Sequence, residues 1–74
     1  MNYIVIEMQT TGETTLTLVN TYDNYPQAEQ KYHTVLAAAA VSTVPLHSAS
    51  MLTERGNLAK HVCYDRTVPV FTED

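Results

Sequence analysis

The sequence is short of the residues with which small proteins gain covalent or metal support. Its 74 residues include one cysteine, Cys63, so a disulfide cannot form within the chain. The three histidines, His33, His47 and His61, lack the paired spacing of a metal site, and we expect neither a metal nor another cofactor. Because a chain this short buries only about 60% of its unfolded surface, we expect close packing or self-association to support the fold.

Basic residues are also scarce. The chain has Lys31, Arg55, Lys60 and Arg66 against eight acidic residues, for a net charge of −4. Four basic residues are too few for a surface that tracks phosphates, so we expect no direct nucleic-acid binding. Mimicry of a nucleic acid would need carboxylates at phosphate-like spacing. The acidic residues are dispersed instead, and a solvated surface explains them better.

Long apolar segments are missing as well. The longest strictly apolar run is Val35 to Val41, far below the ~20 residues that span a bilayer. The start, Met1-Asn2-Tyr3, carries no basic region and is not followed by the apolar region of a secretory signal. Together with the single cysteine, these features predict a cytoplasmic protein without a membrane partner.

What the chain does contain is typical of one folded domain. Hydrophobic residues make up 45% and charged residues 16%, which is not the composition of a disordered protein. The length leaves no room for a second domain. We expect a single α+β domain over residues 1–66 and a C-terminal tail over residues 67–74. In this tail Pro69 favours an edge strand or a docking arm.

Two alternating segments open the chain. Asn2 to Gln9 alternates with a period of two and is rich in β-branched residues, which predicts a strand. A second strand-like run covers Thr14 to Tyr22, and Gly12 lies in the turn between them, where it permits a positive φ. On the second run the face opposite Leu16 and Leu18 is mostly hydroxylated, so it suits a solvated sheet surface.

The helix is the clearest prediction. Asn24 is a good N-cap, Gln27 follows at capping-box spacing, and Pro26 falls in the first turn. One apolar stripe at helical spacing comprises Ala28, Tyr32, Val35, Leu36 and Ala39. Pro45 forbids continuation and pushes the residue before it into an extended conformation, so we expect the helix to end near Val41 to Thr43.

The last third is typical of a second hairpin. Ser48 to Glu54 and Leu58 to Asp65 both alternate, with Gly56 in the turn between them. Lys60 interrupts the more apolar face of the last strand, so which of its faces is buried stays open. The element order is thus ββαββ. A right-handed crossover makes the second and third strands parallel in direction, and the simplest result is a four-stranded antiparallel sheet of order 2-1-3-4 with the helix packed on one face.

One pair of side chains resembles a nucleophile and a base. Cys63 and His61 share a face of the last strand, and Asp65 comes next on that face. The alternative is that Cys63 is a small hydrophobe and His61 a surface residue. Because a flat strand offers no oxyanion site, we predict that the protein is not an enzyme. For His47 we expect a hydrogen bond to the backbone of the loop after Pro45.

A long charge-free stretch points to an interface. Tyr32 to Thr53 contains no formally charged residue. Part of the helix there lies off the core stripe, where a monomer normally places Lys or Glu, although alanine is also the best helix former. Depletion of charge marks interface cores, and small side chains let another backbone approach. The candidate oligomer interface, at the helix end or the open sheet face, comprises Ala37, Ala38, Ala40, Val41, Leu52 and Phe71.

A second hypothesis is an oligomer that sequesters a small ligand or a nucleotide at a subunit boundary. Such a pocket would need aromatic and basic side chains. We assign to this pocket two tyrosines, three basic residues and one histidine. They are Tyr3, Tyr25, Arg55, Lys60, His61 and Arg66.

The run from Tyr25 to His33, continued by Leu36 to Ser42 and Val44 to Ser48, resembles small uncharacterised proteins of gut Firmicutes, their phages and mobile elements. The similarity covers residues 1–66. That group has no established function, so the resemblance transfers no site residues. It implies a setting of compact proteins that act by binding, such as inhibitors of a host defence nuclease or sequestrators of a signalling nucleotide. We therefore predict a non-enzymatic binding module that forms a homo-oligomer and inhibits an unidentified protein partner.

Overall fold

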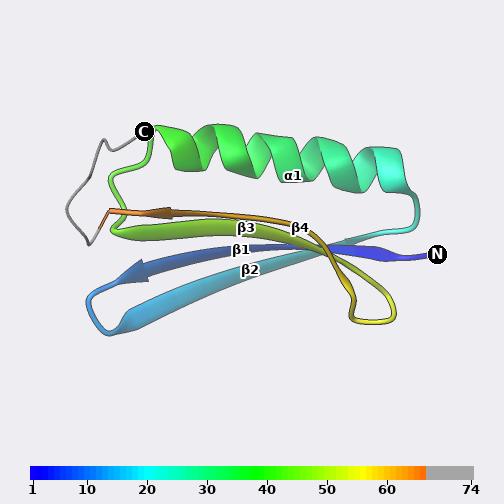
Figure 1. Ribbon diagram of the computed structural model, residues 1–74, viewed down its shortest axis with the longest axis horizontal. Helices are drawn as coiled ribbons and strands as arrows, with labels where there is room; N and C mark the ends of the chain where they lie inside the picture. Colours follow the sequence, from blue (N-terminus) through cyan, green and yellow to red (C-terminus); the bar gives the residue numbers. More distant parts are fainter. Residues whose placement is uncertain (67–74) are drawn as a thin grey trace, which may run out of the picture.

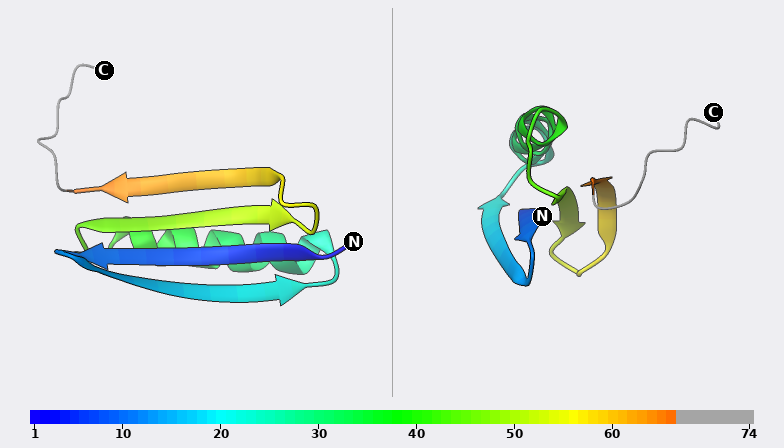
Figure 2. Two further views of the ribbon diagram at one scale, coloured as in Figure 1. Left: turned by 90° about the horizontal axis from the view of Figure 1, so that it is seen from below. Right: turned by 90° about the vertical axis from the view of Figure 1, so that its left-hand side faces the viewer.

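The computed structural model describes residues 1–66, and its four strands and one helix follow the predicted order (Figure 1). They are β1 (Tyr3–Thr11), β2 (Thr14–Tyr22), α1 (Tyr25–Ala40), β3 (Leu46–Thr53) and β4 (Leu58–Asp65). The sheet order is β2-β1-β3-β4, and each neighbouring pair is antiparallel. The helix lies across one face of the sheet (Figure 2). The predicted ββαββ fold with sheet order 2-1-3-4 is confirmed.

Two sequence-based expectations fall partly or wholly outside the described region. The tail over residues 67–74, with Phe71 of the candidate interface, lies outside the described residues.

Within residues 1–66, no helix is both long and apolar enough to cross a membrane.

The first hairpin fixes the register of its two strands through a two-residue turn. Gly12 has a φ of 61°, whereas none of the other described residues except Gly56 has a positive φ. A glycine with positive φ at the first central position is the signature of a type II′ turn, whose twist matches that of the strands. From this turn the pairing runs without interruption from Thr11–Thr14 to Tyr3–Tyr22.

The register determines which side chains face the helix. Val5 lies opposite Asn20 on one side and Met51 on the other, and this row faces α1. The other side of the sheet, here called the open face, carries no helix (Figure 2). Four residues from each strand lie on the open face. They are Ile4, Ile6, Met8 and Thr10 of β1, Thr15, Thr17, Val19 and Thr21 of β2, Leu46, Ser48, Ser50 and Leu52 of β3, and Leu58, His61, Cys63 and Asp65 of β4.

The core lies between α1 and the two central strands. Its buried side chains are Val5, Ala28, Tyr32, Val35, Ala49 and Met51, with Tyr3, Tyr22 and Leu36 packed against them. The predicted helical stripe is confirmed, since Ala39 is buried as well. Asn24 caps the helix through its side-chain oxygen, which accepts from the Gln27 backbone N–H at 3.0 Å. The helix ends at Ala40, just before the expected range.

The structure also answers the question about the last strand. Lys60 pairs with Met51 and Val62 with Ala49, so both lie on the helix side of the sheet, where Lys60 is half-buried and Val62 is exposed. The prediction for His47 is wrong. β3 starts at Leu46, and His47 is a strand residue whose ring contacts Glu7 rather than the loop backbone. Pro45 restricts the residue before it, so nothing prevents the strand from starting directly after the proline.

Arg66 ties the end of β4 to the C-terminus of the helix. Its Nη2 donates to the backbone oxygens of Ala39 and Ala40 at 2.7 and 3.2 Å, and Nη1 donates to the Val44 oxygen at 3.3 Å. The last turn of α1 contains no basic residue of its own. Arg66 therefore supplies the positive charge and the donors that the free carbonyls of a helix C-terminus require.

This cap predicts a measurable loss of stability in Arg66→Met. The variant keeps the aliphatic stem but loses the three hydrogen bonds to the helix end, so the free energy of unfolding should fall by about 1 kcal/mol in urea titrations. Arg55→Met is the matched control, because Arg55 is exposed in the turn between β3 and β4. Equal effects of the two substitutions would contradict the capping role.

Candidate functional site

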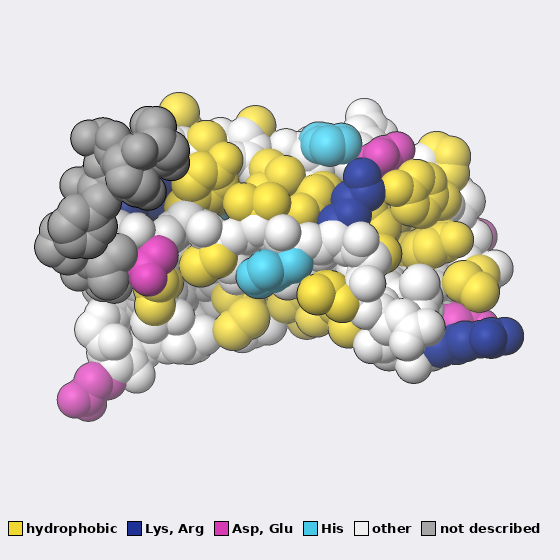
Figure 3. All heavy atoms as spheres, in the orientation of Figure 1, with side chains coloured by type: hydrophobic (Ala, Val, Ile, Leu, Met, Phe, Trp, Pro, Cys, Tyr) yellow, Lys and Arg dark blue, Asp and Glu magenta, His cyan; other side chains and the backbone are white. Residues whose placement is uncertain are grey.

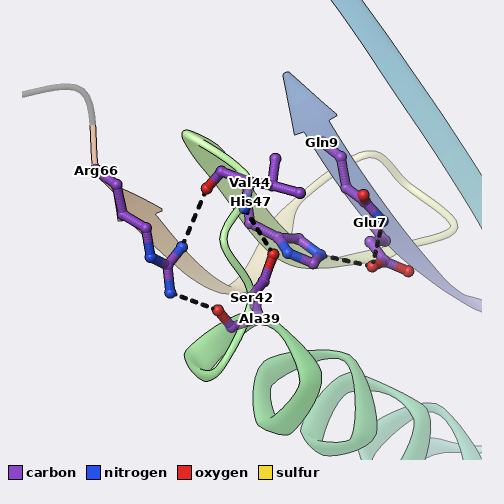
Figure 4. A network of polar contacts seen from close by, with 7 residues as sticks. All are labelled: Glu7, Gln9, Ala39, Ser42, Val44, His47 and Arg66. Carbon is purple, nitrogen blue, oxygen red and sulfur yellow. Dashed lines mark hydrogen bonds and ion pairs between the residues drawn. The ribbon is translucent and has the colours of Figure 1, made fainter. Parts of the chain in front are cut away.

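A buried polar cluster lies on the helix side of the sheet, beneath the end of α1 (Figure 4). The Nε2 of His47 on β3 is 2.6 Å from Oε2 of Glu7 on β1, and Gln9 Nε2 donates to the same oxygen at 3.0 Å. His47 is 4% exposed. Its Nδ1 is buried without a hydrogen-bond partner among the described residues. The cluster joins the two central strands through residues 40 positions apart in the sequence.

The chemistry of this cluster is limited by its position. A carboxylate that holds one nitrogen of an imidazole fixes the orientation of the ring, as it does in many catalytic histidines. The thiol of Cys63, however, belongs to the open face, on the opposite side of the sheet. Within residues 1–66 no group of three or more His, Cys, Asp or Glu side chains is placed to hold a metal ion. The contact of Glu7 with His47 joins β1 to β3, and this supports a structural role.

The structural role can be tested with a double-mutant cycle. Glu7→Leu and His47→Leu should each lower the free energy of unfolding by about 1–3 kcal/mol, because each leaves a polar partner buried without its hydrogen bond. The double variant should lose clearly less than the sum of the two, as expected for side chains in direct contact. Glu13→Leu, at an exposed turn position, is the control. Strictly additive losses would show that the two side chains do not interact.

A second polar cluster lies near the start of α1. Lys60 Nζ is 3.3 Å from Glu29 Oε2, and the Tyr25 hydroxyl donates to the same oxygen at 3.4 Å. The rings of Tyr3 and Tyr25 meet edge to face, with centroids 5.4 Å apart. The hydrogen bond from Lys60 lowers the pKa of Glu29, and the same bond raises the pKa of Lys60. Three predicted ligand residues thus gather here, but the ammonium is already paired with a carboxylate.

The pKa shifts give the pair a defined pH dependence. Because folding lowers the pKa of Glu29, Glu29 contributes to folding stability at pH values above the usual carboxyl pKa. This contribution is lost as the pH falls through the lowered pKa. Folding raises the pKa of Lys60, so Lys60 contributes to folding stability at pH values below the usual lysine pKa. This contribution is lost as the pH rises through the raised pKa.

Lys60→Met should accordingly reduce stability at neutral pH but cost little in acid. Urea unfolding of wild type and variant at pH 7 and at about pH 2.5 gives the difference directly. Lys31→Met is the control. Lys31 lies on the helix and Lys60 on β4, and the effect of Lys31→Met on stability should not follow the titration of Glu29. A difference between wild type and Lys60→Met that stays constant over this range would exclude the pair as its source.

The structure does not bring the other predicted ligand residues to this cluster. Arg66 caps the far end of the helix, and Arg55 is exposed in the turn between β3 and β4. His61 lies on the open face, with Nδ1 2.8 Å from the Ser50 hydroxyl oxygen. Cys63 is exposed on the same face as His61, but the hydrogen bond described for that ring goes to Ser50.

The predicted interface residues occupy two separate surfaces. Ala37, Ala38 and Ala40 are exposed on the helix, and Val41, just after it, is 83% exposed. Leu52 lies on the open face and is half-buried there. The helix end and the open face therefore remain two distinct candidates for a contact with another molecule.

The open face carries apolar side chains that the residue-level predictions missed. Met8, Val19 and Leu58 on it are 40%, 57% and 61% exposed. Among its described residues, Asp65 at one corner is the single formally charged one. Figure 3 views the molecule along the sheet rather than onto the open face, and hydrophobic side chains cover much of the surface that it shows. The signal was present in β1, which has apolar residues on both faces although one helix can cover only one of them.

Comparison of the chain with models of protein families, with curated proteins and with solved structures gives no match. The arrangement of its own residues therefore carries the functional argument. Of the surfaces described, the open face combines the most exposed apolar side chains with the least charge.

Proposed function

We propose that the protein is a non-enzymatic binding module that self-associates, with the open face covered by a second copy of the chain. The observation that carries this proposal is the near absence of charge from that face. A solvated sheet surface normally alternates polar and charged residues outward, whereas this one presents Ile4, Ile6 and Met8 along β1.

Burial of this face would supply stability that the single chain lacks. Each Å² of apolar surface removed from water contributes about 25 cal/mol. Sheets that pack face to face interdigitate their side chains at a spacing of about 10 Å. The threonine and serine hydroxyls between the apolar groups can hydrogen-bond across such a contact. The described core is thin, and small chains gain the most from association.

The lack of charge also favours a second copy over a charged partner. In a two-fold symmetric contact the same patch meets itself, so any net charge on the patch would repel its own copy. Among the described residues, Asp65 is the one formally charged residue placed on the open face. The patch can therefore meet its copy with little electrostatic cost.

The same arrangement bears on the enzyme hypothesis and on the remaining residues of the predicted interface. Cys63 and His61 would lie within the contact, where a substrate could not reach them, which agrees with a non-enzymatic role. The exposed surface formed by Ala37, Ala38, Ala40 and Val41 would stay outside the contact. The sequence predicted these residues for the oligomer interface; in this arrangement we propose them instead as the surface for the unidentified protein partner.

Self-association is tested by sedimentation equilibrium or light scattering at tens of micromolar. The mass should exceed that of the 8.3 kDa chain. Met8→Lys places a charge near the middle of the open face and should raise the dissociation constant at least about tenfold, since an unpaired charge is costly to bury. Gln30→Lys, which adds the same charge on the exposed side of α1, should change nothing. A monomeric wild type would end the proposal.

Cys63 offers an independent readout, because it is the chain's single cysteine and lies on the open face. Its alkylation rate should fall as protein concentration rises, and Met8→Lys should restore the fast rate. Circular dichroism of each variant establishes that it is folded. An oligomer whose Cys63 reacts equally fast at all concentrations would exclude the open face as the contact.

A further inference from the structure

The two edges of the sheet differ in how they are protected. β2 is an edge strand that pairs with β1 alone among the described strands. Its nine residues include no charge, no proline and no glycine, and its register with β1 is uninterrupted. A long, regular and uncharged edge is a template for pairing with another strand, because its outer row of N–H and C=O groups is unpaired.

β4, at the other edge, shows the features that discourage such pairing. It carries Lys60 and Asp65, and its register with β3 is shifted between Met51 and Leu52. Charged side chains and irregular pairing are the devices with which natural sheets blunt their edges. The contrast within one sheet marks β2 as the edge that is left open to a partner.

The side chains of β2 also lack cover. Leu16 and Leu18 point to the helix side but are 54% and 46% exposed. The helix packs mainly over the two central strands and contacts β2 less than either of them; the end-on view shows β2 at one edge of the sheet (Figure 2). Within the described part of the chain, no strand lies on the outer side of these two leucines.

We propose that β2 pairs antiparallel with β2 of a second copy, which joins two chains into one continuous eight-stranded sheet, four strands from each copy. The two-fold axis of such a pair is perpendicular to the sheet. Both helices then lie on one side, and the two open faces merge into one surface. This inference rests on the proposed self-association and adds a second contact to it.

Self-complementarity argues for a second copy rather than for a foreign strand. In the register centred on Thr17, Leu16 lies opposite Leu18 of the second copy, and its own Leu18 lies opposite that copy's Leu16. Thr15 lies opposite Val19 of the second copy on the other side. Directly opposed apolar pairs stabilise a sheet. A register centred on Leu18 would instead place Leu16 opposite Asn20, so it would keep fewer apolar pairs.

Both contacts together predict a closed assembly of four copies. Two edge-paired sheets would stack through their merged open faces, with the helices on the outside. The two kinds of two-fold axis are perpendicular to each other, as closed dihedral symmetry requires. Losing either contact alone should leave a pair of chains.

The edge contact can be detected by disulfide cross-linking in a Cys63→Ser background. Leu16→Cys and Leu18→Cys chains, mixed and oxidised, should give a covalent dimer, because directly opposed strand residues lie within the Cα separation of a disulfide. Either variant alone should cross-link at least about tenfold less, because the identical cysteine of the second copy lies two residues along the strand from the directly opposed position. Contact through the open face cannot produce the mixed product, because both positions are on the helix side.

Two lysine substitutions separate this inference from the proposed function. Leu18→Lys should reduce the assembly from four copies to two while Cys63 stays protected from alkylation. Met8→Lys should also leave two copies, and the mixed cross-link should persist in its background. The double variant should be monomeric, with circular dichroism establishing that it is folded.

Each outcome assigns a failure to one contact. No mixed cross-link and no effect of Leu18→Lys on mass would overturn the edge contact and leave the open face untouched; a β2 edge used by a different protein would give this same result. If the mixed cross-link forms and Met8→Lys leaves the mass of the assembly unchanged, the open-face proposal is overturned and the edge contact is supported. A monomeric wild type without cross-links would overturn both.

Discussion

One helix of 16 residues covers a sheet of four strands, and most features of the molecule depend on this mismatch. The helix packs over β1 and β3, so the core collects around Val5 and Met51 on those two strands. The outer strands receive little cover on the helix side, and among residues 1–66 no helix covers the open face (Figure 2). Apolar side chains thus remain exposed in the single chain on the helix side of β2, on the helix side of β4 and on the open face.

Polar contacts then hold the two layers where apolar packing is thin. Lys60 reaches from β4 to Glu29 near the start of the helix, and Arg66 reaches from beyond β4 to the carbonyls at its end. Between them, Glu7 and His47 join the central strands beneath the helix. The exposed ion pair of Lys60 and Glu29 adds little to the contact between the layers, because solvent screens its charges, whereas the buried contact of Glu7 and His47 strengthens the sheet itself.

The architecture was predictable because its determinants are local. Asn24, Pro26 and the stripe from Ala28 to Ala39 specify the helix from neighbouring residues alone. The strand order follows from the chain direction and the handedness of the crossover. The faces were harder to predict, since β1 alternates between Ile4-Ile6-Met8 and Tyr3-Val5-Glu7, and the more apolar set is the one that the helix does not cover.

The polar contacts were not predictable from spacing, because each depends on a residue far away in the chain. His47 was expected to bind the loop beside it, but its partner is 40 positions away on the strand next to its own. Arg66 was grouped with Lys60 and Tyr25 by residue type, whereas the fold places it at the opposite end of the helix. Side-chain chemistry identified residues able to make contacts, and only the register determined which contacts they make.

The contact of Glu7 with His47 also has a consequence for how the chain folds. The two hairpins and the helix each form from neighbouring residues, which can happen within microseconds. Pairing of β1 with β3 must close a loop of some 40 residues first, and this entropy is lost before the new contacts form. The central pair of strands is therefore the slow step, and until it forms the inner edges of both hairpins are as open to another chain as the edge of β2 is in the finished fold.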